Sequence, residues 1–202
     1  MHASLSTISP ATARRLAEHH KAHGADYVAA PVFGRPEAAA AAKLFCLAAG
    51  PAAAKKRLEP IQAAIGQGTF DFGEEVGAAN VVKLCGNFMI AATIEALAEM
   101  LTLAEKNGVD KSAVAEMIGK FSPLHYTYAK VIAERRFTPP GFRLVHGMKD
   151  VNLIMQTAAA STTPLPLASL LHDRWLSAIA KGRGELDWSA IALGVAEDAG
   201  LK

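Results

Sequence analysis

The segment with the clearest chemical potential begins at Gly77 and contains Lys83 and Asn87. Residues four apart in a helix project from one face, so the ammonium of Lys83 and the amide of Asn87 can converge on one ligand. Their neighbours are largely apolar, and burial among apolar groups lowers a lysine pKa, which suits a proton donor and acceptor near neutral pH. The same pattern is compatible with a structural role, in which Lys83 extends to solvent and Asn87 caps a neighbouring loop. Gly77 and Gly86 favour the chemical interpretation, because each costs helix stability and indicates close packing against the backbone.

Three further segments carry polar residues at positions where proteins bind ligands. Residues 6–10 lie at a predicted strand-to-helix junction, and residues 30–35 follow a predicted strand, at the end where open α/β sheets place ligands. Residues 137–150 form a proline-rich loop and a helix whose first turn is predicted to carry Lys149 and Asp150. Taken separately, each segment is also typical of ordinary proteins, because serine and glycine at strand ends and solvated ion pairs are common.

The first third of the sequence alternates between short β-prone and helix-prone stretches, which is typical of a layered α/β fold. Strands are predicted over residues 5–8, 26–31 and 44–48, and helices over residues 11–23, from residue 36, and over residues 52–65. Ser9 as N-cap, Pro10 in the first turn and Gly24 as the stop define the first helix. Pro60 is expected to kink or split the helix that contains it. Three short strands leave an edge of the sheet bare, so the sequence is expected to begin within an α/β domain.

From Gly77 onward the pattern is wholly helical. Helices are predicted over residues 80–106, from Asp110 as N-cap to residue 120, and over residues 125–135, 148–161, 168–181 and 188–199. Long apolar helices bury each other, so this half predicts a helical bundle with an oligomer interface, and we expect a homodimer or higher homo-oligomer. The predicted fold class is α/β followed by all-α, with a majority of helix and domains at residues 1–75 and 76–202.

The composition excludes several classes of protein. Hydrophobic residues make up 51% of the chain and charged residues 20%, which excludes an intrinsically disordered tail. Lysine and arginine number 21 against 19 acidic residues, giving a formal net charge of +2, and the basic residues are scattered. This balance gives no electrostatic argument for nucleic acid, so we expect no nucleic-acid partner.

Membrane and metal sites are not predicted either. The mean hydropathy of +0.18 arises from alanine-rich runs, and no stretch reaches about 18 consecutive apolar residues, so no membrane span is expected. The first residues show no charged segment followed by an apolar one, so a secretory signal is not expected. The two cysteines, Cys46 and Cys85, lack metal-ligand spacing, and we expect reduced, buried thiols in a cytoplasmic protein without a metal.

In this order and spacing, the four segments resemble the 3-hydroxyisobutyrate dehydrogenase family, also called the β-hydroxyacid dehydrogenases, and the related 6-phosphogluconate dehydrogenases. The resemblance covers nearly the whole chain. The family's strand-end Ser-Thr is similar to residues 6–7, and its Asp-Ala-Pro-Val-Ser-Gly-Gly segment to residues 29–35. Its Gly-x-x-x-x-x-Lys-x-x-x-Asn helix matches Gly77, Lys83 and Asn87. Its late Lys-Asp pair matches Lys149 and Asp150, and its Thr-Pro-hydrophobic-Pro stretch matches residues 163–167.

The resemblance implies a fold and a mechanism. Residues 1–75 would be the C-terminal part of a Rossmann-like dinucleotide-binding domain, and residues 76–202 a helical substrate and dimerisation domain. The cofactor would be NAD or NADP, and the substrate a small 3-hydroxy acid or semialdehyde. Lys83 would be the catalytic acid/base as a hydride moves to or from nicotinamide, and Asn87 would orient the substrate. The implied substrate-binding residues are Val32, Phe33, Gly34 and Arg35, and the implied cofactor-binding residues are Thr7 and Lys149.

The sequence departs from the family pattern at several positions. The family begins with a strand, a Gly-x-Gly-x-x-Gly turn and a helix, which have no counterpart before Ser6, so a longer native product or a truncated member is expected. In the substrate segment, the family's Asp is Ala29, its Ser is Phe33 and its second Gly is Arg35. Gly86 stands where the family commonly has asparagine.

Three hypotheses follow. The first is an NAD(P)-dependent oxidoreductase of the hydroxyacid class, active as such or within a longer polypeptide. The second is a non-catalytic remnant that keeps only the dimerising helical half. The third is an enzyme like the imine reductases, which share the architecture but usually replace the lysine with another proton donor. Lys83 and Asn87 favour the first, because a remnant has no physical reason to keep that pair.

Overall fold

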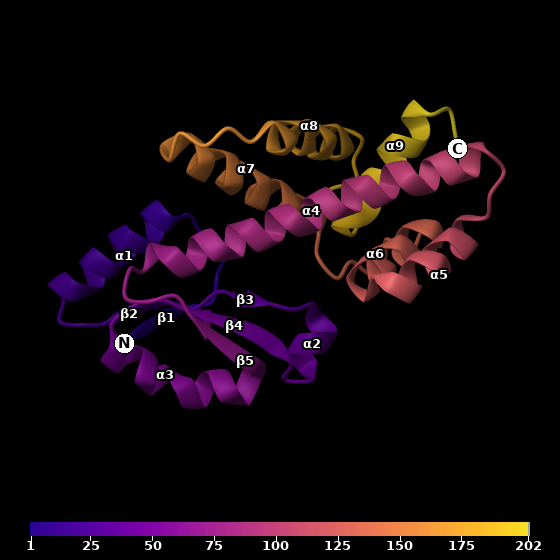
Figure 1. Cartoon of the computed structure of the whole chain (residues 1–202). Coiled ribbons are helices and arrows are strands. Elements are labelled where there is room, and N and C mark those ends of the chain that lie inside the picture. Colours follow the sequence, from indigo (N-terminus) through magenta and orange to yellow (C-terminus); the bar gives the residue numbers. More distant parts are fainter. Residues whose placement is uncertain (202) are drawn as a thin grey trace. The chain divides into compact units, whose positions relative to one another are not determined.

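The computed structural model describes residues 1–201, without the side chains of residues 121, 123 and 124, and shows a largely helical chain with short strands near its N-terminus (Figure 1). It divides into two compact units. The sheet unit comprises residues 1–87 and 156–162. The helical unit comprises residues 88–155 and the chain from residue 163 onward. The predicted domain boundary after residue 75 precedes the long helix α4 (Gly77–Lys106), and the two units divide within that helix.

The sheet unit contains two small sheets. Its elements, in chain order before α4, are β1 (His2–Ser4), α1 (Pro10–Ala22), β2 (Tyr27–Ala29), β3 (Val32–Phe33), α2 (Pro36–Ala40), β4 (Leu44–Ala48), α3 (Ala52–Ile65) and β5 (Gly66–Asp71). Strands β1 and β2 pair in parallel, with His2 opposite Tyr27. Strand β4 pairs in parallel with β5 and antiparallel with β3. Figure 1 places α1 and α3 on opposite sides of the strands, so the fold of this unit is layered α/β as predicted.

Local sequence signals explain most elements of the sheet unit. The Ser9 side chain accepts a hydrogen bond from the Thr12 N–H, Pro10 opens α1, and Gly24 has a φ of +67° just beyond its end, as predicted. The predicted strand over residues 5–8 is wrong, because β1 ends at residue 4 and a loop leads from it to the Ser9 cap. Helix α3 continues through Pro60 without being split.

Two strands were not predicted from the sequence. Strand β3 has only two residues, which is too short for an alternating pattern. Strand β5 contains two glycines and is largely exposed, and glycine is depleted in strands. Parallel pairing with the buried strand β4 fixes its conformation in spite of this composition.

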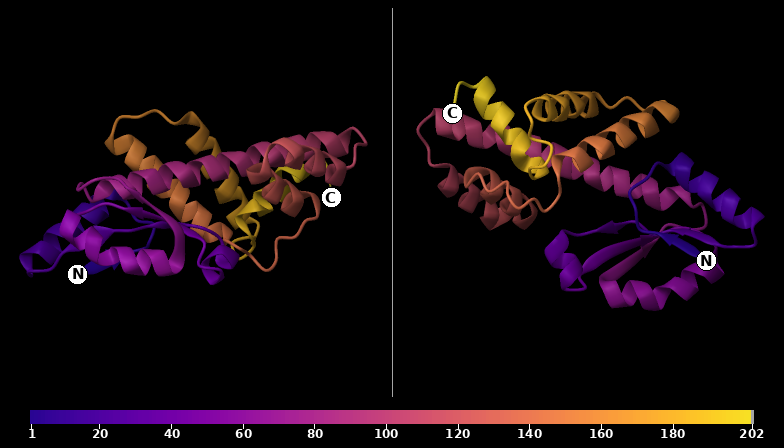
Figure 2. Two further views of the ribbon diagram at one scale, coloured as in Figure 1. Left: turned by 60° about the horizontal axis from the view of Figure 1, so that its bottom comes forward. Right: turned by 180° about the vertical axis from the view of Figure 1, so that it is seen from behind.

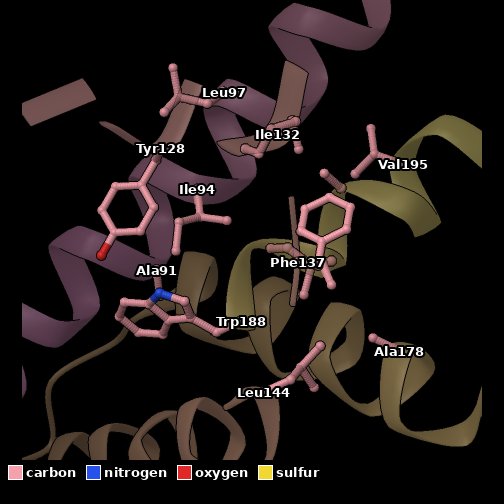
Figure 3. Close-up of a cluster of buried hydrophobic side chains, with 14 of the residues drawn as sticks. Ala91, Ile94, Leu97, Tyr128, Ile132, Phe137, Leu144, Ala178, Trp188 and Val195 are labelled. Carbon is pink, nitrogen blue, oxygen red and sulfur yellow. The ribbon is translucent and has the colours of Figure 1, made fainter. Parts of the chain in front are cut away.

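The helical unit contains the rest of α4 and the predicted helices that follow it. These are α5 (Lys111–Phe121), α6 (Pro123–Ala133), α7 (Leu144–Ala160), α8 (Pro166–Ala180), the 3₁₀ helix η1 (Trp188–Ile191) and α9 (Ala192–Asp198). The end of α7, from residue 156, belongs to the sheet unit. Side chains from α4, α6, η1 and α9 meet in its core, where Tyr128 and Trp188 lie beside Ile94 (Figure 3). The Asp110 carboxylate accepts a hydrogen bond from the Ser112 N–H at the start of α5, as predicted. Helix α7 begins four residues earlier than predicted, so Lys149 and Asp150 lie in its second turn and not in its first.

Helix α4 is long and apolar enough to cross a membrane by length and composition alone. Its side chains Ile94 and Leu101 are fully buried in the core of the helical unit. It also carries the buried polar residues Lys83, Asn87 and Glu95. These features are typical of the central helix of a packed bundle. The two views in Figure 2 show the same long helix from below and from behind.

Both cysteines have free thiols. Cys46 is buried in β4, as predicted, and burial raises the pKa of its thiol. Cys85 is exposed on α4, so its predicted burial is wrong. Its position in the helix turns it to the face opposite Lys83 and Asn87, which an apolar sequence neighbourhood does not indicate.

Candidate active site

Lys83 and Asn87 lie one turn apart near the start of α4, in the part of that helix that belongs to the sheet unit. Their exposed fractions are 9% and 5%, so both side chains are buried on the same face of the helix. The exposed fraction shows that Lys83 does not extend into solvent. Because burial of a charged group is costly unless it is compensated, a lysine at this position needs interactions that stabilise its ammonium.

One such interaction comes from Phe33, on strand β3. The Nζ atom of Lys83 lies 3.8 Å from the centroid of the Phe33 ring, within the range of a cation–π contact. Gly86 provides the space for the ring. A Cβ atom built on Gly86 would lie 2.6 Å from Cε1 of Phe33 and closer still to Cζ. Phe33, Lys83 and Gly86 therefore form one packed group.

An ion pair holds the start of α4. The Arg14 Nε atom on α1 lies 2.8 Å from Oε1 of Glu75, and the same carboxylate accepts a hydrogen bond from the Gly77 N–H at 3.1 Å. The hydrogen bond with Arg14 and its charge lower the pKa of the Glu75 carboxyl, and the same contact raises the pKa of the Arg14 guanidinium. A Cβ on Gly77 would lie 3.0 Å from both side chains, so glycine at this position leaves room for the pair.

The segment after β2 brings Phe33 to this helix. Pro31 accepts a hydrogen bond from the Leu47 N–H, and β3 then pairs with β4. Gly34 has a φ of +148°, and a Cβ there would lie 2.5 Å from Cδ2 of Leu44, so both conformation and space favour glycine. Arg35 is half-buried at the N-cap position of α2.

Thr7 lies at the same edge of the first sheet as this segment. Strands β1 and β2 are parallel, so the loop after β1, which contains Thr7, and residues 32–35 after β2 follow the carboxyl ends of neighbouring strands. The Ala30 N–H donates to the Ser4 carbonyl, which ties the two strand ends together. The topology thus gathers Thr7, Val32, Phe33, Gly34 and Arg35 at one edge, and Phe33 connects that edge to Lys83.

Lys149 lies on the other unit. It is exposed on α7, and its Nζ atom lies 3.0 Å from Oδ1 of Asp150, whose side chain is buried. Seven of the eight predicted site residues belong to the sheet unit, and Lys149 belongs to the helical unit. Its participation in the same site stays a prediction. In the part of the chain that the structure describes, no group of three or more His, Cys, Asp or Glu residues could hold a metal ion.

Sequence reasoning missed the pairing of Phe33 with Gly86 and the buried carboxylate of Asp187. Phe33 and Gly86 each depart from the family pattern. The available signal was their complementary size, because a large side chain replaces serine and glycine replaces asparagine. Asp187 organises the loop before α7: it accepts hydrogen bonds from the N–H groups of Gly141 and Phe142, 46 and 45 residues earlier. No local pattern indicates such a contact.

The chain matches two families of known proteins. Residues 77–194 match the family described as NAD-binding of NADP-dependent 3-hydroxyisobutyrate dehydrogenase. Residues 1–86 match the family described as NAD binding domain of 6-phosphogluconate dehydrogenase. The two matches together cover nearly all of the chain.

Individual relatives agree with these families. An uncharacterized oxidoreductase of Bacillus subtilis, YfjR, is 40% identical over 193 residues, which cover 95% of this chain and 68% of that protein. A 3-hydroxyisobutyrate dehydrogenase of Pseudomonas aeruginosa is 31% identical over 198 residues, which cover 92% of this chain and 66% of that protein. This chain therefore corresponds to about two thirds of the length of these relatives.

Solved structures show the same similarity. The crystal structure of a 3-hydroxyisobutyrate dehydrogenase from Salmonella typhimurium superposes with a TM-score of 0.87 and 28% identity, covering 94% of this chain and 67% of that one. An imine reductase from Myxococcus stipitatus has a TM-score of 0.56 and 18% identity, covering 94% of this chain and 68% of that one. The latter comparison shows a shared fold alone.

Proposed function

Because the chain belongs to the 3-hydroxyisobutyrate dehydrogenase family of NAD(P)-dependent oxidoreductases, we propose that it binds a small 3-hydroxy acid or semialdehyde and transfers the proton that accompanies hydride transfer. The observation that carries this proposal is the buried pair of Lys83 and Asn87, one turn apart and next to the edge where two parallel strands end. Assembly as a homodimer or higher homo-oligomer and a cytoplasmic location are part of the same proposal.

The residues present fit the nicotinamide end of a dinucleotide. Thr7 and residues 32–35 follow the carboxyl ends of parallel strands, where open α/β sheets bind such ligands. When bound, the nicotinamide supplies or accepts the hydride. No Gly-x-Gly-x-x-Gly turn occurs in this sequence, so no residue is assigned to the pyrophosphate. Thr7, and Lys149 from the helical unit, are the residues that we assign to the cofactor.

Lys83 acts as the acid/base in this proposal. In the direction of reduction, its ammonium donates a proton to the carbonyl oxygen of the semialdehyde as that oxygen gains negative charge. In the direction of oxidation, the neutral amine accepts the proton of the hydroxyl group. The Asn87 amide hydrogen-bonds the same oxygen and orients it. The backbone of residues 32–34 and the fixed cation of Arg35 hold the substrate carboxylate.

Cofactor binding is the first test. In a calorimetric titration of the 202-residue chain with NADH and with NADPH, we expect micromolar binding of at least one of them. A chain that is folded by circular dichroism and binds neither would contradict the assignment of the nicotinamide to these residues. Hydride transfer would then need a longer polypeptide, and the 202-residue chain by itself would be a non-catalytic dimerising module.

The role of Lys83 is tested by substitution in the form of the protein that turns over. Lys83→Ala removes the proton donor, and we expect kcat for semialdehyde reduction to fall by about 10²–10⁴-fold with the fold intact. Lys106→Ala is the matched control, because Lys106 is exposed at the other end of the same helix. Activity of Lys83→Ala within a few-fold of the wild type would refute the acid/base assignment.

A further inference from the structure

The ring of Phe33 is positioned by the backbone of α4 and by its apolar neighbours. A Cβ at residue 86 would collide with two ring carbons, so the ring fits only over a glycine. Leu47, Phe72 and Val82 line, together with Phe33 and two other phenylalanines, an apolar hollow of about 360 Å³. The ring lies against the backbone of α4 at Gly86 and packs against the apolar cluster of the sheet unit that contains Leu47, and these contacts limit its rotation.

The same ring faces the buried ammonium. A cation within about 6 Å of an aromatic centroid is attracted by the negative face of the ring, and this attraction is larger where water is excluded. Lys83 Nζ lies 3.8 Å from the Phe33 centroid and the side chain is 9% exposed, so both conditions hold. A lysine side chain has several rotatable bonds, and a contact of this kind selects one position for its ammonium.

We propose that Phe33 is a positioning residue for Lys83, and that Phe33 and Gly86 form one interlocked pair, in which the glycine admits the ring and the ring fixes the ammonium. The catalytic consequence rests on the proposed function of Lys83. The contact itself does not, so it can be tested without turnover. The pair also explains physically why two departures from the family pattern occur together: a serine at 33 leaves space for a side chain at 86, and a phenylalanine does not.

The interlock is tested by a double-mutant cycle on thermal stability. Alanine is favoured over glycine inside a helix by about 1 kcal/mol, which corresponds to a rise in Tm of about 2–4 °C for a chain of this size. In the wild-type background, Gly86→Ala forces the ring out of its site, and we expect Tm to fall. In the Phe33→Ala background the obstacle is gone, and we expect the same substitution to raise Tm by about 2–4 °C.

A matched control shows that the sign reversal belongs to the pair. Gly194 lies inside α9, and no atom comes within 4 Å of a Cβ built there. Gly194→Ala is therefore expected to raise Tm in both backgrounds. If Gly86→Ala raises Tm in the wild-type background as Gly194→Ala does, the ring does not depend on the glycine and the interlock is refuted.

The position of the ammonium is tested by NMR of the full chain with ¹³C-labelled lysine and no chemical modification. The ε-methylene group of Lys83 is bonded to the Nζ atom that lies 3.8 Å from the ring centroid, so we expect an upfield shift of its protons that disappears in Phe33→Leu, which keeps an apolar side chain but removes the aromatic face. Resonances of Lys106 are expected to stay unchanged.

The outcomes separate the two proposals. Loss of the ring-dependent shift in Phe33→Leu, together with a reduced kcat, supports both. An unshifted Lys83 resonance in the wild type refutes the positioning role, even if Lys83→Ala abolishes turnover. A ring-dependent shift together with full activity of Lys83→Ala refutes the acid/base role and leaves the contact between Phe33 and Lys83 standing.

Discussion

The buried carboxylate of Asp187 connects two segments of the helical unit that lie far apart in sequence. Its Oδ2 atom accepts hydrogen bonds from the N–H groups of Gly141 at 2.9 Å and Phe142 at 3.3 Å. Its Oδ1 atom accepts from the N–H of Ser189 at 3.1 Å and from the hydroxyl of the same residue at 2.6 Å. The side chain is 1% exposed. One residue therefore anchors the loop before α7 and caps η1.

Replacement of Asp187 by alanine leaves these donors without their acceptor. Ser189 is fully buried, so its N–H cannot turn to water, whereas Gly141 and Phe142 are half-buried and recover part of their hydration. A buried donor without a partner costs about 1–3 kcal/mol, and a hydrogen bond to a charged group contributes about 1.5–3 kcal/mol. Two deeply shielded contacts and two partly shielded ones add up to a destabilisation of roughly 3–5 kcal/mol for Asp187→Ala.

Guanidinium denaturation followed by circular dichroism measures this loss. Asp187→Asn keeps one acceptor oxygen but turns an NH₂ group toward other donors, so we expect roughly 1–3 kcal/mol for it. Asp173→Ala is the control, because the Asp173 side chain is 84% exposed, and we expect a change within about 0.5 kcal/mol. Hydrogen exchange should show reduced protection of the Gly141 and Ser189 amides in Asp187→Ala. A midpoint within experimental error of the wild type would refute the reasoning.

Two further substitutions test the helical unit. Burial raises the pKa of the Glu95 carboxyl in spite of the attraction of Arg174. Between the unfolded pKa of about 4.3 and the raised pKa of the folded state, the folded protein binds more protons than the unfolded one. The free energy of unfolding therefore falls as pH rises through this window. Glu95→Gln should remove this fall. In urea denaturation between pH 4.5 and 7, the free energy of unfolding of the variant should rise relative to that of the wild type, and parallel plots against pH would contradict the prediction. A Cβ on Gly147 would lie 2.5 Å from Nε1 of Trp175 and 3.2 Å from Cε3 of Trp188. Gly147→Ala should therefore lower the free energy of unfolding by about 1–3 kcal/mol, and an unchanged Tm would contradict this packing.

The elements that the sequence predicted correctly are those whose signals are local. Ser9 and Asp110 accept hydrogen bonds from N–H groups within three residues, so the type and spacing of neighbouring residues are sufficient to locate the helix starts. The long helix α4 follows in the same way from an apolar run without proline. Strand β5 depends instead on pairing with β4, which its own glycine-containing sequence does not encode. Residues 5–8 are β-prone, but in the described part of the chain they form the loop between β1 and α1.

In the candidate site too, local spacing predicts some side-chain positions, while others depend on segments that are distant in sequence. The spacing of Lys83 and Asn87 predicts a shared helix face, because four residues in a helix make about one turn, and both side chains are buried on it. The neighbour that faces Lys83 comes from residue 33, fifty positions earlier, and reaches it only through the turn after β2 and the pairing of β3 with β4. The sequence contains the volumes that make this contact possible, a phenylalanine and a glycine, but their adjacency is a property of the fold. For that reason the sequence predicts Lys83 as a candidate acid/base, while its contact with Phe33 is found only in the structure.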